Sequence, residues 1–267
     1  MSSTATTSAV PVGVTIDGHV AVIEVQNPPA NYFDLDVLRR IAQVGHELAQ
    51  DGTRAIVLAS QGKHFCAGLN FGAGGGLGDE RARQTREVYT AAAQIFRIPV
   101  PVVAAVQGAA VGGGLGLACA ADFRVAAPSS RFHANFSSLG FHQGFGLSVS
   151  LPRIVGEQTA SRMLLTAERV TGEEARTTGL ADVLVADGDD ANASVREGAI
   201  ELAETIAGRA PLAVRSIRAT LREGLADAVT EVLDHEIAEQ IDLWKTQDCI
   251  EGIAANLERR PAVFVAR

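Results

Sequence analysis

The sequence predicts an α/β fold followed by a helical C-terminal region. Up to about residue 190, short apolar or β-branched runs alternate with stretches of helical spacing, a pattern typical of an α/β core. After Asp190 only helical patterns follow. The chain has 267 residues, of which 47% are hydrophobic, so it can bury a substantial core as one large domain or as a core with an appendage.

Six short runs have the composition of strands. Asp17 and Gly18 separate the first two runs and form a hairpin signal. The third and fourth runs are apolar throughout, as expected of buried strands. The predicted strands are residues 12–16, 20–25, 55–59, 102–106, 123–126 and 183–185.

Helices are predicted between and after these strands. Asp34 is a suitable N-cap for a helix over residues 35–48, and Pro99 and Pro101 end another over residues 81–96. Shorter helices are expected over residues 146–151, 158–165 and 172–178, and longer ones over residues 194–208, 211–225, 228–249 and 251–258. The glycine-rich residues 72–78 should be mobile.

Turn residues at 187–192 mark the best candidate boundary. The chain is therefore divided into a disordered N-terminus (residues 1–10), an α/β core (residues 11–190) and a helical region (residues 191–267).

Charge and cysteine content exclude several classes of protein. The formal net charge is −8 and no basic run exists, which argues against nucleic acid and anionic membranes as partners. No apolar run reaches the roughly 18 residues of a membrane span, and residues 1–10 lack the features of a signal peptide. Cys66, Cys119 and Cys249 are too widely spaced for a metal pair, so we expect no metal and a reduced, cytoplasmic location.

Two glycine-containing segments are the strongest functional signal. Gly112–Gly114 follow a strand-like run and open a helix, so the first helical N–H groups are free and a ligand can approach the backbone closely. A second N–H could face them from the turn at Gly68 and Leu69. Two convergent backbone donors are what an enolate or a tetrahedral oxyanion requires.

The glycine run at residues 112–116 matches a dinucleotide-binding motif poorly. Leu117 stands where the last glycine of G-x-G-x-x-G should be, and no G-K-[ST] phosphate loop is present. A nucleotide-dependent oxidoreductase would therefore require direct evidence of NAD binding.

The two segments resemble the crotonase family, also called the enoyl-CoA hydratase/isomerase family. Phe65-Cys-Ala-Gly-Leu-Asn70 is similar to its F-x-A-G-x-D pattern, and Ala105–Asp122 to its A-x-x-G-x-x-x-G-G-G pattern with a helix and Asp. Further similar segments occur in the same order along nearly the whole chain, at residues 27–31, 139–156, 179–183 and 256–264.

The resemblance implies a fold, an assembly and a substrate. The family core is a spiral of β-β-α units, and its helical C-terminal part builds trimers that often pair into hexamers. The substrate is an acyl-CoA thioester, so coenzyme A arrives with the substrate and no separate cofactor is needed. The family's two oxyanion donors correspond to the N–H groups of Leu69 and Gly113.

Further positions are carried over for binding of the substrate. Asn27 and Ala30, with Ala67 and Gly68, would frame the adenine and pantetheine. The remaining substrate contacts would come from the glycine turn, from aromatic residues of the acyl site, and from the tail of a neighbouring subunit. These residues are Gly112, Phe136, Phe141, Phe264 and Arg267, with Phe145 as a further aromatic residue.

The usual acidic residues of the family are absent. The catalytic Glu two residues after the triple glycine corresponds to Gly116, and the second Glu corresponds to Phe136. An acid that some relatives carry in the turn after L-G corresponds to Gly144. Water activation by paired carboxylates, one acting as base and one as acid, therefore cannot proceed here in the standard way.

His142, beside Gln143, is the candidate replacement, because an imidazole can act as base or acid near neutral pH. Other titratable or polar residues are better explained as structural. His133 and Tyr89 should be packed, His64 should be exposed, Asn70 should be a turn residue, and Asp79 and Glu80 should begin a helix.

The sequence is compatible with several functions. The first is an enzyme of the hydratase or isomerase type that forms an enolate. The same fold could instead perform decarboxylation or thioester hydrolysis, and decarboxylation requires the least from the protein because no strong base is needed. A further alternative is a non-catalytic acyl-CoA-binding protein that keeps the fold without the acids.

Overall fold

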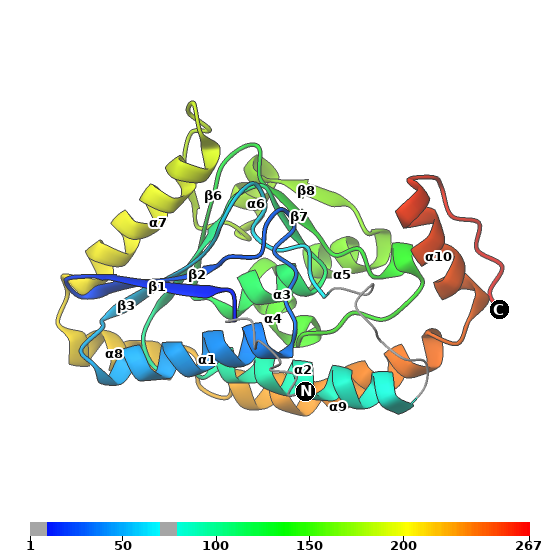
Figure 1. Ribbon diagram of the computed structural model, residues 1–267, viewed down its shortest axis with the longest axis horizontal. Helices are drawn as coiled ribbons and strands as arrows, with labels where there is room; N and C mark the ends of the chain where they lie inside the picture. Colours follow the sequence, from blue (N-terminus) through cyan, green and yellow to red (C-terminus); the bar gives the residue numbers. More distant parts are fainter. Residues whose placement is uncertain (1–9, 70–78) are drawn as a thin grey trace, which may run out of the picture.

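The computed structural model describes residues 10–69 and 79–267, which form two sheets surrounded by helices (Figure 1). The larger sheet has six strands in the order β1-β2-β3-β4-β6-β9, parallel except for the β1–β2 hairpin. Its strands are β1 (Val12–Asp17), β2 (Val20–Val25), β3 (Ala55–Ser60), β4 (Val102–Val106), β6 (Phe123–Ala126) and β9 (Val183–Leu184). All six strands predicted from the sequence are thus confirmed.

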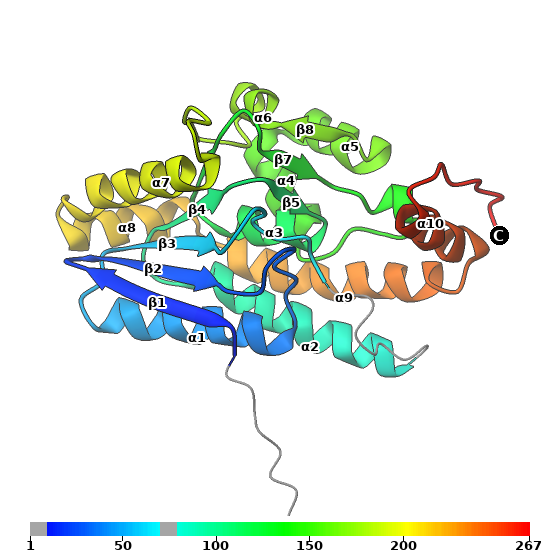
Figure 2. The same cartoon turned by 45° about the horizontal axis from the view of Figure 1, so that its top comes forward.

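The central strands are buried because helices cover both faces of the large sheet. Every residue of β3 and β4 is buried, which accounts for their continuous apolar runs. Figures 1 and 2 show α7 (Ala191–Ala207) on one face and α1 (Leu35–Gln50) with α2 (Asp79–Phe96) on the other. The side chain of Asp34 accepts a hydrogen bond from the N–H of Val37 at 2.9 Å and caps α1, as predicted.

A second, three-stranded sheet was not predicted. It consists of β5 (Ala109–Val111), β7 (Arg131–His133) and β8 (Arg169–Thr171), in that order. Each strand has three residues, too short for a period-two pattern to register in the sequence. This sheet fixes the residues immediately before α3 (Gly113–Ala120).

The remaining helices lie after β7 along the chain, and those from α7 onward form the C-terminal region. The three short predicted helices are confirmed as α4 (Leu147–Val155), α5 (Glu157–Thr166) and α6 (Gly172–Thr178). They are preceded by η1 (Ser137–Leu139) and followed by α7 and α8 (Pro211–Leu221).

One predicted helix is wrong, because residues 228–249 belong to two helices. The first is α9 (Leu225–Leu243), and the second is α10 (Gln247–Glu258). Thr246 begins α10 as its N-cap, with its hydroxyl accepting a hydrogen bond from the N–H of Cys249 at 3.1 Å. Helical periodicity continues across this break, so the pattern alone concealed it.

The last helix packs closely on η1, which follows β7. A Cβ atom on Gly252 would lie 2.6 Å from the carbonyl carbon of Leu139, so only glycine allows this approach of α10 to η1. The C-terminal tail returns along α10, where the carbonyl of Arg267 accepts the N–H of Gln247 at 2.6 Å.

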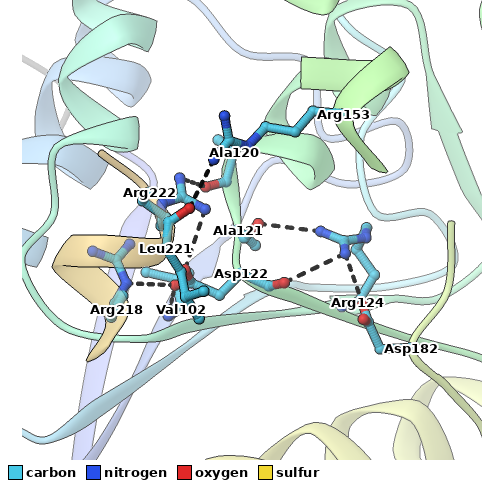
Figure 3. A network of polar contacts seen from close by, with 10 residues as sticks. All are labelled: Val102, Ala120, Ala121, Asp122, Arg124, Arg153, Asp182, Arg218, Leu221 and Arg222. Carbon is cyan, nitrogen blue, oxygen red and sulfur yellow. Dashed lines mark hydrogen bonds and ion pairs between the residues drawn. The ribbon is translucent and has the colours of Figure 1, made fainter. Parts of the chain in front are cut away.

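A buried ionic network attaches α8 to the large sheet (Figure 3). One oxygen of Asp122 accepts the N–H of Val102 and the Nε–H of Arg218, both at 2.8 Å. Its other oxygen lies 3.2 Å from a guanidinium nitrogen of Arg222. Removing one member of such a buried network leaves an uncompensated charge and is strongly destabilising.

No helix in residues 10–69 and 79–267 combines the length and apolar character needed to cross a bilayer. The predicted division of the chain near residue 190 coincides with the start of α7, where the side chain of Asp190 accepts hydrogen bonds from Asn192 and Ala193. Whether this point separates independent domains stays a prediction.

Candidate functional site

The two glycine-containing segments meet beyond the carboxyl ends of β3 and β4. Because β3 and β4 are parallel, the residues after them leave the sheet at the same edge. The N–H of Cys66 donates to Ala109 at 3.0 Å, and the carbonyl of Cys66 accepts from Val111 at 2.9 Å. These bonds align the segment before Leu69 with the one that opens α3.

Gly68 is the point of closest approach between the two segments. Its φ angle is +90°, which side-chain-bearing residues rarely adopt. A Cβ atom there would lie 3.0 Å from the carbonyl oxygen of Val111 and 3.3 Å from the backbone nitrogen of Gly113. The backbone of Gly68 therefore lies directly against the first turn of α3.

Among the residues that the structure describes, the first N–H groups of α3 have no acceptor. Gly112 provides no side-chain cap, and the first recorded helical hydrogen bond runs from Gly116 to Gly112 at 3.1 Å. Within the described ranges, neither Gly113 nor Leu69 has an intramolecular acceptor for its N–H. Free N–H groups at a helix start are suited to binding an oxyanion.

Asn31 holds the segment before Leu69 in place. Its side chain is fully buried and donates to the carbonyls of Gln61 and His64 at 2.8 and 2.6 Å. Its own amide oxygen accepts the N–H of Asn27 at 3.1 Å. Asn31 thereby links the early turn to the glycine-containing segment.

Four of the predicted substrate-binding residues are brought together by this arrangement. The N–H of Ala67 donates to the carbonyl of Ala30 at 2.9 Å, and the carbonyl of Gly68 accepts from Phe33 at 3.1 Å. Asn27 is exposed at the same turn. The structure thus places Asn27, Ala30, Ala67 and Gly68 on adjoining stretches of backbone.

Aromatic side chains fill the space beside Gly116, the position that corresponds to the first missing acid. A Cβ atom on Gly116 would lie 2.6 Å from Cβ and 2.7 Å from Cγ of Phe145, which is fully buried. One on Gly113 would lie 2.6 Å from the ring of Phe33. The two rings pack against each other with their centroids 5.4 Å apart.

The position corresponding to the acid of some relatives, Gly144, is also closed. A Cβ atom there would overlap the hydroxyl of Tyr89 and lie 2.7 Å from Nε2 of Gln240. Tyr89 is buried and bonded to Gln240, and burial raises the pKa of its phenol. Tyr89 is therefore packed, as the sequence predicted.

Phe136 and Phe141 are both buried and contact each other edge to face, with ring centroids 5.8 Å apart. Phe136 borders the glycine turn, because a Cβ atom on Gly112 would lie 3.8 Å from the end of its ring. The structure thus places Phe136 beside the glycine turn. Phe141 lies next to it, in contact with the ring of Phe136.

His142 lies in the turn before α4, where its half-buried ring faces α9. Its Nδ1 lies 2.8 Å from the carbonyl of Gln143, and its ring centroid lies 5.7 Å from that of His235. The carbonyl of His142 accepts a hydrogen bond from Gln240 at 2.9 Å.

The sequence reasoning missed two buried polar residues of α9. Glu236 and Gln240 are almost fully buried, at 0% and 1% exposure. Oxygens of the Glu236 carboxylate accept the N–H groups of Gly146 at 2.8 Å and Ser148 at 3.0 Å. Burial raises the pKa of Glu236, although these hydrogen bonds favour its charged form. A glutamate beside Leu233 and Ile237 on the apolar stripe of α9 was the available signal.

The tail residues Phe264 and Arg267 are not brought to the site within one chain. Phe264 is 46% exposed, and the N–H groups of Val265 and Ala266 donate to Asp248 of α10 at 2.6 and 2.9 Å. These contacts tie the tail to α10 rather than to the glycine turn.

Other candidates take structural positions. The Nε2 atom of His133 lies 2.9 Å from the carbonyl oxygen of Ala167, as expected of a structural residue. His64 is half-buried where exposure was expected, because its Nδ1 atom is enclosed beside Gly108. Glu80 is exposed and paired with Arg83.

Asn70 and the glycine run at residues 72–78 lie outside the described residues, and Asp79 begins α2. Among the described residues, no group of three or more His, Cys, Asp or Glu side chains could hold a metal ion.

Comparison with known proteins identifies one family. The family model described as enoyl-CoA hydratase/isomerase matches residues 15–267. A probable enoyl-CoA hydratase of Mycobacterium tuberculosis strain H37Rv is 35% identical over 236 residues, covering 87% of this chain and 90% of that protein. Another from Rhodobacter capsulatus is 37% identical over 234 residues, covering 85% and 89%.

Solved structures agree with this result. The structure of DspI from Pseudomonas aeruginosa is 31% identical, with a TM-score of 0.73, and the match covers 99% of this chain and 100% of that one. An enoyl-CoA hydratase from Mycobacterium avium subsp. paratuberculosis is 24% identical with a TM-score of 0.80, covering 96% and 98%, and shows the likeness of fold alone.

The contact between Gly116 and Phe145 generates a first prediction. Gly116→Ala should destabilise the protein by about 1–3 kcal/mol, because the added methyl group overpacks against Phe145. In a Phe145→Gly background the same change should stabilise, since alanine is the better helix former. Urea unfolding of both single variants and the double variant measures this coupling; additive effects would contradict the packing described.

Glu236 generates a second prediction, on the pH dependence of stability. Its pKa in the folded protein is raised above the ordinary value of 4.5, so the fold holds its proton more tightly than the unfolded chain does. The free energy of unfolding, relative to that of Glu236→Gln, should therefore fall as the pH rises above about 4.5 and level off beyond the folded-state pKa. Urea unfolding between pH 4.5 and 8 tests this, with exposed Glu239→Gln as the control; a constant difference between wild type and Glu236→Gln would refute it.

Proposed function

Because the chain belongs to the enoyl-CoA hydratase/isomerase family, we propose that it is a crotonase-type enzyme that stabilises the enolate of an acyl-CoA thioester. The observation that supports this most directly is the contact of Gly68 with the start of α3. The two segments touch there, and among the described residues the N–H groups of Leu69 and Gly113 have no acceptor.

In the proposed mechanism, the thioester carbonyl oxygen accepts hydrogen bonds from the N–H groups of Leu69 and Gly113. Negative charge develops on this oxygen as the enolate forms, so both bonds strengthen toward the transition state. Fixed backbone donors need no reorganisation during the reaction. Loss of one such donor typically lowers the rate about 10²–10³-fold.

We assign the proton transfer to His142. Its Nδ1 lies against the carbonyl of Gln143, which fixes one ring nitrogen and leaves Nε2 as the group that exchanges a proton. Asn27, Ala30, Ala67 and Gly68 frame the coenzyme A part of the substrate. Phe136 and Phe141, with Gly112, border the acyl group, and no separate cofactor takes part.

Aromatic packing at the family's acid positions favours a second candidate reaction. Phe145 and Tyr89 fill the space beside Gly116 and Gly144, which disfavours activation of water by paired carboxylates. Decarboxylation of an acyl-CoA needs only the oxyanion site, because loss of carbon dioxide itself generates the enolate. Hydrolysis of a thioester, or acyl-CoA binding without turnover, are the remaining alternatives.

The proposal includes a homotrimer, or a hexamer of two trimers, in the cytoplasm. Exposed apolar residues on the C-terminal tail, Val263 at 71% and Phe264 at 46%, are suited to burial against a neighbouring subunit. There Phe264 and Arg267 would contact the coenzyme A of the neighbour.

Gly113→Pro tests the oxyanion donor. Proline removes the N–H and is well tolerated at the first residue of a helix, where no intrahelical bond is lost. Gly113→Ala is the matched control, because it adds a Cβ atom against Phe33 but keeps the N–H. Turnover should fall about 10²–10³-fold in Gly113→Pro relative to Gly113→Ala. Equal rates in the two folded variants would exclude Gly113 as a donor.

Isotope incorporation identifies the reaction. The protein is incubated with a short trans-2-enoyl-CoA in deuterated, ¹⁸O-labelled water and the product is analysed by mass spectrometry. A hydratase reaction should introduce both ¹⁸O and deuterium at carbon, whereas an isomerase reaction should introduce deuterium at carbon alone. We expect neither label in the product from His142→Ala. Unchanged enoyl-CoA would favour decarboxylation, hydrolysis of another acyl group, or binding alone; full activity in His142→Ala would exclude His142.

A further inference from the structure

We propose that Phe145 determines the acyl specificity of the proposed oxyanion site, and that Glu236 and Gln240 of α9 are positioning residues that hold Phe145 in place. This inference rests on the proposed function, because it assigns the space beside Gly113 and Gly116 to the acyl group. α9 packs against α4, the helix that follows the turn containing Phe145.

The backbone of Phe145 is in a conformation that its side chain disfavours. Its φ angle is +64°, in the left-handed region where bulky residues are rare. Gly146, which follows, has a φ of +71°, as glycine readily allows. A bulky residue remains in such a conformation only where the surrounding structure enforces it, and such residues cluster at functional sites.

Two residues of α9 enforce this conformation from both sides of Phe145. After it, the carboxylate of Glu236 accepts the N–H groups of Gly146 and Ser148 at 2.8 and 3.0 Å. Before it, the side chain of Gln240 donates to the carbonyl of His142 at 2.9 Å. The turn is thus fixed to α9 at both ends, and the ring of Phe145 packs against α3.

The ring of Phe145 fills the space beside the proposed donor. It is fully buried, and its atoms lie 2.6–2.7 Å from a Cβ atom built on Gly116 and 3.7 Å from one built on Gly113. A smaller residue at position 145 leaves empty volume next to the two glycines. An acyl group with more bulk near its carbonyl can occupy that volume only when the ring is absent.

The structure therefore assigns this enzyme to acyl groups that are slender beside the thioester carbonyl. An unbranched acyl chain needs none of the volume that the ring fills, whereas a branched or aromatic acyl group does. Discrimination arises from steric exclusion rather than from a polar contact, and each excluded methyl-sized group is worth about 10–200-fold.

The test compares binding of butyryl-CoA and benzoyl-CoA, two probes without the enoyl double bond, to the full-length protein by calorimetry. We expect wild type to prefer butyryl-CoA. The ratio of the two dissociation constants should shift toward benzoyl-CoA by about tenfold or more in Phe145→Ala and by less in Phe145→Leu. Glu236→Gln should shift the ratio in the same direction and speed amide exchange at Gly146 and Ser148. Exposed Glu239→Gln on the same helix should leave both readouts unchanged.

Each result bears on the inference. If a folded Phe145→Ala protein loses affinity for both thioesters equally, Phe145 is only a core residue and the inference is overturned. If that variant does not fold, the ratio measured in Phe145→Leu decides in the same way. Wild type that binds neither thioester would reject the proposed function and this inference with it, whereas binding of both with an unmoved ratio rejects this inference alone.

Discussion

The close approach of the backbone at Gly68 to the first turn of α3 is the constraint on which the candidate site depends. Gly68 has a φ of +90°, and a Cβ atom there would press against Val111 and Gly113. On the other side, a Cβ atom on Gly114 would overlap the carbonyl of Cys66. Glycine is thus required on both segments, because a side chain at Gly68 or Gly114 would push the two stretches of backbone apart.

The rest of the fold supports this contact from several directions. The parallel strands β3 and β4 deliver both segments to one edge of the sheet, and the short strand β5 aligns the second segment. Buried Asn31 ties the first segment to the early turn. The ring of Phe145 fills the space beside Gly116, and Tyr89 with Gln240 of α9 fills the space beside Gly144, the two positions where the family resemblance led us to look for acidic side chains.

Much of the fold follows from local sequence patterns. Asp34 ends a loop and caps α1 with its own side chain, so a short-range signal located that helix correctly. The buried strands were recognisable from apolar runs. The three-residue strands of the small sheet were missed because their pairing joins segments far apart in the chain, and Thr246 was overlooked as the cap that starts α10.

The sequence predicted the site only at positions where glycine is needed for close contact with another stretch of backbone. The contact between Gly68 and Gly113 follows the motifs closely, whereas Glu236 lies 90 residues from the N–H of Gly146 that it binds. No local pattern encodes such a pairing. The left-handed backbone of Phe145 was hidden for the same reason, since the interactions that enforce it come from α9.

The central claim is that the N–H groups of Leu69 and Gly113 hold the carbonyl of an acyl-CoA thioester. Infrared difference spectroscopy of a butyryl-CoA labelled with ¹³C at the thioester carbonyl tests it directly. Two hydrogen bonds from preorganised donors polarise the carbonyl, so its stretching band should move to lower wavenumber on binding. A band that stays at its solution frequency in the bound complex would show that the carbonyl lies elsewhere and would contradict the account.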